Sequence, residues 1–225
     1  MNRQPSYDSP VLVLAADTSL PLLSVALLND RTLLGAVVLE GKGSRNEKLL
    51  PAIDWLLAES GVGRAAIELF ATTRGPGSFT GVRIGLATIQ GLALALGRPV
   101  VAMSTHEAIA LGEGASSDAP ADGLARIAVY DDAGRGELYL SLFEGHREIV
   151  APRLATERER EELTRDAVLV LPVSEFVQHA NVAVGCARRA LEIVARGEAD
   201  GYRDVTPIYV RLAEAEVKLR QSQHA

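Results

Sequence analysis

The sequence predicts an α/β fold in which helices cover mixed β-sheets. Strand-like apolar runs alternate with helical segments, a hairpin precedes that alternation, and the opening pattern recurs in the second half of the chain. Of the 225 residues, 48% are hydrophobic and 23% are charged, which is an ordinary globular balance. This length suits either one large domain or two compact lobes.

The first half of the chain reads as three strands followed by a helix–strand alternation. Asn29-Asp30 joins two strand-like runs, and both residue types favour tight hairpin turns. Gly61 and Gly97 each follow a helical segment and act as stop signals. We expect strands at residues 11–16, 22–28, 32–39, 67–73 and 99–103, and helices at 44–60, 78–96 and from about 105.

The second half begins after a stretch of small, polar, turn-forming residues, 112–123, which is the best candidate for a linker. A strand at 125–130 then ends in Asp131-Asp132, as the first strand ends in Asp17, and a hairpin follows at 137–143 and 148–151. A duplicated lobe and a chance likeness between two hairpins fit this pattern equally well. Beyond it we expect a charged helix at 156–165, a strand at 168–171 and a helix at 186–196.

Composition removes several classes of function. The 29 acidic residues outnumber the 23 basic ones, so the net charge of −6 gives no long-range attraction for a phosphate backbone. A single cysteine, Cys186, excludes a disulfide framework within the chain and a multi-thiolate zinc site. The four histidines are far apart and none has a helical metal-binding spacing, so no metal site is expected.

The apolar segments favour a cytoplasmic protein. The N-terminal residues lack the apolar core of a signal peptide. The longest apolar stretch, 84–96, is interrupted by Thr88 and Gln90, so we interpret it as too short and too polar to span a bilayer. We therefore expect no membrane association.

The densest motif is the glycine-rich segment from Arg74 to Gly85, which follows a strand and opens a helix. Free N–H groups at a helix N-terminus suit an anion, and glycine permits close approach of a ligand or of another backbone. No Lys-Ser or Lys-Thr follows Gly81, so this is not a Walker A loop, and the glycine spacing is not that of a dinucleotide fingerprint. Two interpretations remain: a capped helix start packed closely against the sheet, which we favour, or an anion site.

The first two helices show signs of a partner surface. The helix at 78–96 has no polar face, so it must be covered on both sides. The helix at 44–60 has one apolar stripe, with Trp55 on roughly the opposite face. Trp55 either covers a neighbouring loop or anchors a protein partner, and small residues along the second helix let a partner helix approach closely.

Six short segments together resemble the TsaB (YeaZ) family, bacterial proteins of tRNA threonylcarbamoyladenosine biosynthesis. The glycine-rich segment is the most specific of them, and the resemblance is strongest between Val11 and Ser104. The segments are Ala16-Asp17-Thr18-Ser19, Glu47-Lys48-Leu49-Leu50-Pro51, Arg74 to Gly85, Gly91 to Gly97, Asp132 to Tyr139, and Pro207-Ile208-Tyr209-Val210-Arg211.

This resemblance implies the actin-like, sugar-kinase-like ATPase fold, built from two ribonuclease-H-like lobes that are each a mixed sheet covered by helices. The first lobe would span residues 10–111 and the reduced second lobe 124–225, joined by the linker at 112–123. Residues 1–9 would be a disordered N-terminus. The C-terminal segment from about residue 205 would pack back on the first lobe.

The resemblance also implies a non-catalytic subunit that binds and activates TsaD, the subunit that transfers threonylcarbamoyl to the adenosine next to the anticodon of tRNA. Further implied partners are a TsaE-like ATPase, a second copy of this chain when TsaD is absent, and tRNA through the complex only. The metal-binding His-x-x-x-His of TsaD is missing, and Asn46 and Glu47 stand near its place. ATP and metal are therefore expected in the partner subunits, with no catalytic residue in this chain.

Two sets of site residues follow from the resemblance. The family dimerises through its first two helices, which gives as expected partner interface Leu49, Pro51, Ala52, Trp55, Arg83, Gly85, Ala87, Ile89 and Gln90. The phosphate-facing turns lack the glycines that grip ATP, so at most a weak nucleotide site is expected, formed by Asp17, Thr18, Ser19, Gly75, Gly77 and Ser78. The alternative is an active ATP-dependent small-molecule kinase in which Asp17 or Asp131-Asp132 holds Mg²⁺ or acts as base.

Overall fold

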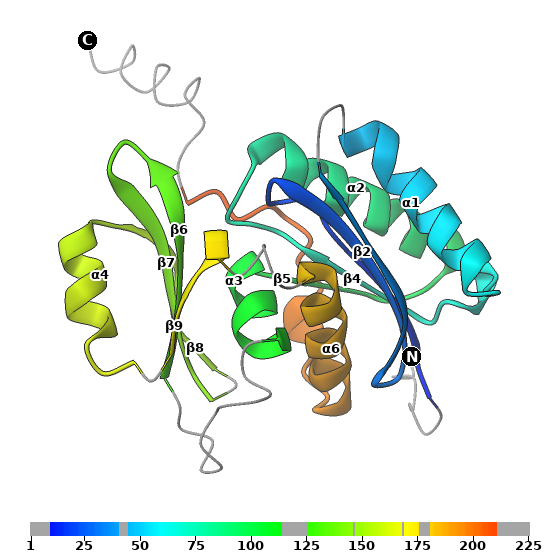
Figure 1. Cartoon of the computed structure of the whole chain (residues 1–225). Coiled ribbons are helices and arrows are strands. Elements are labelled where there is room, and N and C mark those ends of the chain that lie inside the picture. The colour runs from blue at the N-terminus through cyan, green and yellow to red at the C-terminus, as the bar shows by residue number, and fades with distance from the viewer. Residues whose placement is uncertain are drawn as a thin grey trace, which may run out of the picture.

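The computed structural model contains two β-sheets with helices packed against them (Figure 1). It describes residues 10–40, 45–113, 126–145, 147–167, 169–175 and 181–210. The expected disordered N-terminus, residues 1–9, and residues 114–123 of the expected linker lie outside the described residues. The first two residues of that linker, Gly112 and Glu113, instead end the π-helical segment η2 (Ala108–Glu113).

The first sheet has five strands in the order β3-β2-β1-β4-β5. Strands β1, β2 and β3 form an antiparallel ladder, and β4 and β5 continue the sheet in parallel with β1. The turn after β2 places Asp30 at a positive φ of 50°, a conformation that Asp tolerates. The strands span Leu12–Asp17, Leu22–Asn29, Thr32–Glu40, Leu69–Thr73 and Val100–Met103. The five strands expected from the sequence are thus present.

Helices α1 (Arg45–Glu59) and α2 (Phe79–Leu96) cover one face of this sheet (Figure 1). Leu49 of α1 and Ile89 of α2 pack in one cluster with Phe70 of β4. The 3₁₀ segment η1 (Arg64–Ala66) leads from α1 toward β4. Apolar stripes on the two helices therefore form the core on this side of the sheet.

Helix α2 is apolar enough to require a separate explanation. Its length and its mean hydropathy of 1.4 are sufficient for a membrane span, contrary to the expectation that this region is too short and too polar. In the fold it lies on the sheet with Val82, Leu86 and Ile89 among its buried residues. This packing accounts for the apolar residues on one side of the helix only, because 33% of the helix is buried and apolar side chains such as Leu94 stay exposed on its other side.

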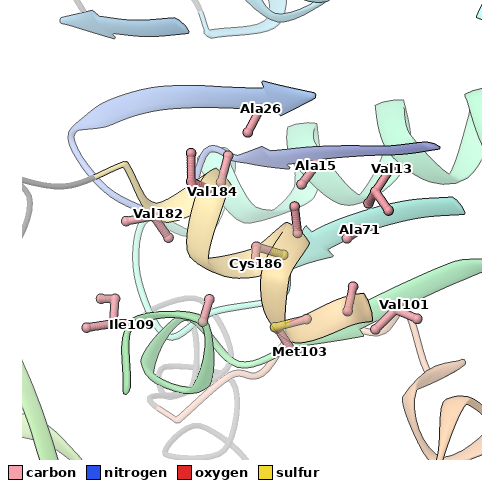
Figure 2. Packing of buried hydrophobic residues seen from close by; sticks show 14 of the residues in the cluster. Val13, Ala15, Ala26, Ala71, Val101, Met103, Ile109, Val182, Val184 and Cys186 are labelled. Atoms are coloured by element: carbon pink, nitrogen blue, oxygen red, sulfur yellow. The ribbon is translucent and has the colours of Figure 1, made fainter. Parts of the chain in front are cut away.

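Helix α6 (Val182–Ala195) covers the opposite face of the first sheet, where Val184 and Cys186 share a hydrophobic cluster with Ala15 of β1 and Ala26 of β2 (Figure 2). The backbone N–H of Ala183 donates to Ser24 Oγ of β2 at 3.1 Å. Helix α6 falls within residues 124–225, the expected second lobe, and it packs on the first sheet while sharing a hydrophobic cluster with Ile127 and Phe143 of the second sheet. The physical reason is that the first sheet presents a buried apolar face here, which needs a cover.

The second sheet has four strands in the order β8-β7-β6-β9 and, within the residues that the structure describes, repeats the first sheet without a counterpart of β5. Strand β6 pairs antiparallel with β7 and parallel with β9, as β1 pairs with β2 and β4. Helix α4 (Glu157–Thr164) lies on its outer side (Figure 1). The strands span Arg126–Gly134, Glu137–Glu144, Arg147–Ala155 and Leu169–Pro172. The predicted fold class, mixed sheets covered by helices with a smaller second sheet, is confirmed.

A buried polar cluster ties together the elements between the two sheets. Helix α3 (Thr105–Glu107) supplies Glu107, whose Oε1 accepts from Arg189 Nε of α6 at 3.0 Å. The hydroxyl of Tyr202, in the 3₁₀ segment η3 (Ala199–Tyr202), donates to the same oxygen at 2.7 Å. His106 Nδ1 lies 2.8 Å from Ser141 Oγ of β7. Polar contacts therefore accompany the apolar core that joins the sheets.

Candidate protein interface

The glycine-rich turn lies against the turn between β1 and β2. A Cβ atom built on Gly77 would be 2.4 Å from the carbonyl oxygen of Ser19, and one on Gly81 would be 2.0 Å from that of Thr18. At Gly85 the nearest atom is Thr18 Oγ1, also at 2.4 Å. No side chain fits at such distances, so these glycines are required by the close approach of the chain to itself.

Hydrogen bonds occupy the helix start where an anion would bind. The N–H of Ser78 donates to the carbonyl oxygen of Ser19 at 2.7 Å, and Thr18 Oγ1 donates to the carbonyl oxygen of Gly81 at 2.6 Å. Ser78 Oγ caps the helix by accepting from the N–H of Gly81 at 3.2 Å. These contacts use donors that a phosphate-binding loop leaves free for its ligand.

The carboxylate of Asp17 is enclosed behind this turn. Its Oδ1 accepts from the N–H of Ser19 at 3.1 Å, from Ser19 Oγ at 2.5 Å and from Thr73 Oγ1. Its Oδ2 is buried without a hydrogen-bond partner in the described part of the chain, and burial raises the pKa of the carboxyl group. Gly75 is also buried, with a built Cβ 3.1 Å from the carbonyl oxygen of Ile208. Asp17 therefore stabilises a turn and does not face an open site.

The corresponding acidic pair of the second sheet makes local contacts. Asp131 Oδ1 accepts from the N–H of Asp132 at 2.9 Å, and Asp132 Oδ1 accepts from the N–H of Gly134 at 2.7 Å. Burial raises the pKa of Asp131. Both carboxylates act as turn acceptors at the β6–β7 hairpin.

Within the part of the chain that the structure describes, no three His, Cys, Asp or Glu side chains come together as ligands for a metal ion. Asn46 and Glu47 lie exposed in the first turn of α1. His106 is buried, and burial lowers its pKa to about 3, so it is neutral at physiological pH.

The structure divides the expected partner interface into an outer and an inner set. Pro51, Trp55 and Ala87 are exposed, as are Arg83 and Gln90. The inner set lies in the core and supports the helices from within; it comprises Leu49, Ala52, Gly85 and Ile89. A partner that approaches α1 and α2 would therefore contact the outer set.

Three exposed apolar side chains near the expected interface residues were not predicted from the sequence. Leu94 is 83% exposed, Leu50 45% and Phe79 43%, whereas Trp55, which the sequence did indicate, is 57% exposed. An all-apolar helix carries no sequence signal for which side faces solvent, which explains why Leu94 was not singled out. We use the term α1–α2 face for the exposed residues Leu50, Pro51, Trp55, Phe79, Arg83, Ala87, Gln90 and Leu94.

The segment formed by residues 203–210, which we call the strap, crosses the beginning of the glycine-rich turn. The N–H of Ile208 donates to the carbonyl oxygen of Arg74 at 2.7 Å, and Arg74 Nη1 forms an ion pair with Asp204 Oδ2 at 2.9 Å. Val205 packs against Val82 and neighbouring residues of the core. The strap therefore lies on the first sheet's side of the molecule.

Comparisons with known proteins give a consistent picture. The family model of TsaD, tRNA N6-adenosine threonylcarbamoyltransferase, matches residues 42–164. The tRNA threonylcarbamoyladenosine biosynthesis protein TsaB of Escherichia coli is 36% identical over 59% of this chain and 54% of its own length. The structure of YeaZ from Pseudomonas aeruginosa superposes with a TM-score of 0.67 and 27% identity, covering 88% of this chain and 99% of that one.

The full-length alignment distinguishes between the two related families. The tRNA threonylcarbamoyladenosine biosynthesis protein TsaB of Bacillus subtilis is 31% identical to this chain, and the alignment covers 94% of this chain and 99% of that protein. The TsaD model, in contrast, matches an internal part of the chain. This protein therefore belongs to the TsaB family of tRNA threonylcarbamoyladenosine biosynthesis proteins.

Proposed function

We propose that this chain is the non-catalytic subunit of the complex that transfers threonylcarbamoyl to the adenosine next to the anticodon of tRNA. It acts by binding and activating a TsaD-like catalytic subunit through the α1–α2 face. The observation that carries this proposal is the exposure of Trp55 and Leu50 on α1 and of Leu94 on α2, two helices that pack on the same face of the first sheet. Large exposed apolar side chains at a helical surface are typical of binding sites for other proteins.

The α1–α2 face has the chemistry of a protein contact. Burying apolar surface there contributes roughly 25 cal/mol per Å², and tryptophan is enriched among the residues that dominate binding energy. Ala87 and the neighbouring Gly91 are small and exposed, so a partner helix can approach the backbone of α2 closely. The TsaD match and the TsaB relatives support a partner of the TsaD type.

Nucleotide chemistry is proposed to belong to the partners. The turn at Asp17, the glycine-rich turn and Ser78 bind one another, which supports weak nucleotide binding at most in this chain. ATP and metal are then supplied by the catalytic subunit and by a TsaE-like ATPase. The kinase alternative is not favoured, because the curated relatives are named for threonylcarbamoyladenosine biosynthesis.

Three further properties complete the proposal. The chain forms a homodimer through the α1–α2 face when the catalytic subunit is absent, since the same apolar side chains then need a cover. tRNA is bound by the assembled complex, in keeping with the net charge of −6 on this chain. The protein works in the cytoplasm without a membrane contact.

The experiment that tests this proposal measures threonylcarbamoyladenosine formation on tRNA by a TsaD-like subunit and its ATPase, with and without this chain. Activity that depends on the chain, together with a complex detected by calorimetry, is expected. Trp55→Asp and Leu94→Asp should abolish both, whereas the control Ile149→Asp, an exposed apolar position on β8, should leave both unchanged. Full activity without the chain, or normal binding by both variants, would refute the proposal.

A further inference from the structure

A single exposed stripe runs along α2 and contains one charged side chain. Phe79, Arg83, Ala87, Gln90 and Leu94 follow one another at intervals of three or four residues, so they share one side of the helix, and all of them are exposed. Arg83 is the only charge among them. A single arginine in an otherwise uncharged stripe therefore raises the question of which groups it contacts, within this chain or on a partner.

Two aromatic rings hold this arginine: that of Phe79, one turn earlier in α2, and that of Tyr209 in the strap. The guanidinium carbon of Arg83 lies 3.9 Å from the ring centroid of Phe79 and 5.5 Å from that of Tyr209, distances at which a cation is attracted to an aromatic face. Arg83 Nε donates to the hydroxyl of Tyr209 at 2.7 Å, and the two rings lie 5.1 Å apart between centroids. The side chain is therefore fixed before any partner arrives.

The strap supplies Tyr209 and is itself anchored. Ile208, the preceding residue, donates its N–H to the carbonyl oxygen of Arg74, and Asp204 pairs with the side chain of Arg74. These contacts leave Tyr209 little freedom relative to the start of α2. Tyr209 is consequently a positioning residue for Arg83.

The remaining donors of Arg83 face no acceptor within the residues that the structure describes. Only its Nε–H is used there, by Tyr209, and no carboxylate lies within ion-pair distance of the guanidinium among those residues. Both Nη groups thus remain for a group outside, and a planar guanidinium binds a carboxylate with two parallel hydrogen bonds. Fixing a side chain in advance lowers the entropy lost on binding.

We propose that Arg83 binds an aspartate or glutamate carboxylate on the protein partner that covers the α1–α2 face, and that Tyr209 and Phe79 hold it in place for this contact. The inference rests on the proposed function, and it names the charged contact that the same interface would make. A protein carboxylate fits better than a nucleic-acid phosphate, because the stripe around Arg83 is uncharged and mostly apolar and the chain carries a net charge of −6.

The test compares the affinity of full-length variants for the TsaD-like subunit by calorimetry. Arg83→Ala should raise Kd about thirtyfold, as expected for a residue that dominates an interface, and Tyr209→Phe, which keeps the ring, about fivefold. The matched control is Arg158→Ala on α4, where an exposed arginine pairs with Glu162 within its own helix. The control should bind like the wild type, and all variants should keep the wild-type thermal midpoint within a few degrees.

A charge swap identifies the group that Arg83 meets. Arg83→Glu should abolish binding, and a Lys replacing the contacted Asp or Glu of the partner should restore it, which a purely structural role of Arg83 would not allow. Binding of tRNA to this chain alone that depends on Arg83 would overturn the inference in favour of a phosphate. If the wild type fails to bind the partner, the proposed function falls as well; if it binds and Arg83→Ala binds equally, this inference alone is wrong.

Discussion

The substitution Gly81→Ala tests whether the glycine-rich turn is a contact of the chain with itself. A Cβ atom at this position would lie 2.0 Å from the carbonyl oxygen of Thr18, whereas carbon–oxygen contacts normally require about 3.3 Å. The atom in the way belongs to the backbone and cannot rotate aside, so the turn after β1 and helix α2 would have to move apart by about 1 Å. That movement also disturbs the hydrogen bond from Thr18 Oγ1 to Gly81.

The cost can be worked out from these two effects. Overpacking costs about 1–3 kcal/mol and a lost buried hydrogen bond about 1 kcal/mol, which gives a loss of about 2–4 kcal/mol. For a chain of 225 residues this lowers the thermal midpoint by about 4–16 °C. Differential scanning calorimetry or urea unfolding measures the change.

Gly91→Ala in the same helix is the matched control. Gly91 is exposed, and no atom lies within 4 Å of a Cβ built there. Alanine should therefore stabilise the helix by about 0.5–1 kcal/mol. If both substitutions shift the midpoint in the same direction, or if Gly81→Ala is as stable as the wild type, the assigned role of the glycine is wrong.

Two further predictions concern the polar groups between the sheets. Burial lowers the pKa of His106 from 6.5 to about 3, so the unfolded chain binds a proton that the folded chain does not. The contribution of His106 to stability is therefore greatest above pH 6.5 and falls by about 2 kcal/mol between pH 8 and pH 5, which a comparison of urea midpoints of the wild type and His106→Gln at several pH values will isolate. Arg189 is 1% exposed and pairs with both Glu107 and Glu192, so Glu107→Gln should cost about 2–4 kcal/mol in denaturant unfolding, because it removes the more buried of the two carboxylates that balance this charge.

A control variant tests each of these two predictions. His106→Gln retains a hydrogen-bonding side chain next to Ser141 but cannot titrate, so an unchanged pH slope in this variant would contradict the first. Tyr202→Phe removes a neutral hydroxyl from the same oxygen of Glu107 and should cost only about 1 kcal/mol. Equal losses for Glu107→Gln and Tyr202→Phe would show that the charge of Arg189 is not decisive.

Local sequence patterns predicted the elements well and their mutual placement poorly. Strand β1 is buried on both faces and reads as a continuous apolar run, and α2 begins at the Ser78 cap and ends at Gly97, both of which are strong local signals. The position of α6 could not be predicted in this way. Its amphipathic pattern predicts that one side of the helix is buried. It does not predict against which sheet, because the first sheet lies far away in sequence and the contact depends on tertiary packing.

The same limit applies to the candidate site. The sequence indicated that α1 and α2 carry the partner surface, yet it assigned Gly85 and Ile89 to the surface although both are buried. Their placement depends on contacts with Thr18 and with β4, which lie outside the helix. For the same reason Gly85→Arg would disrupt the fold, and Leu94→Asp is the cleaner probe of the α1–α2 face.

The position of α6 affects how far the first sheet can fold while the chain is being synthesised. Ser24 of β2 accepts a hydrogen bond from Ala183, and Arg83 of α2 donates one to Tyr209, so two early elements make contacts with residues that leave the ribosome much later. Until then the side of the first sheet that bears Val13 and Ala71 stays open to solvent. The first sheet with α1 and α2 is thus not a self-sufficient unit during synthesis, and a nascent chain of that length is a natural client for a chaperone that shields apolar surface.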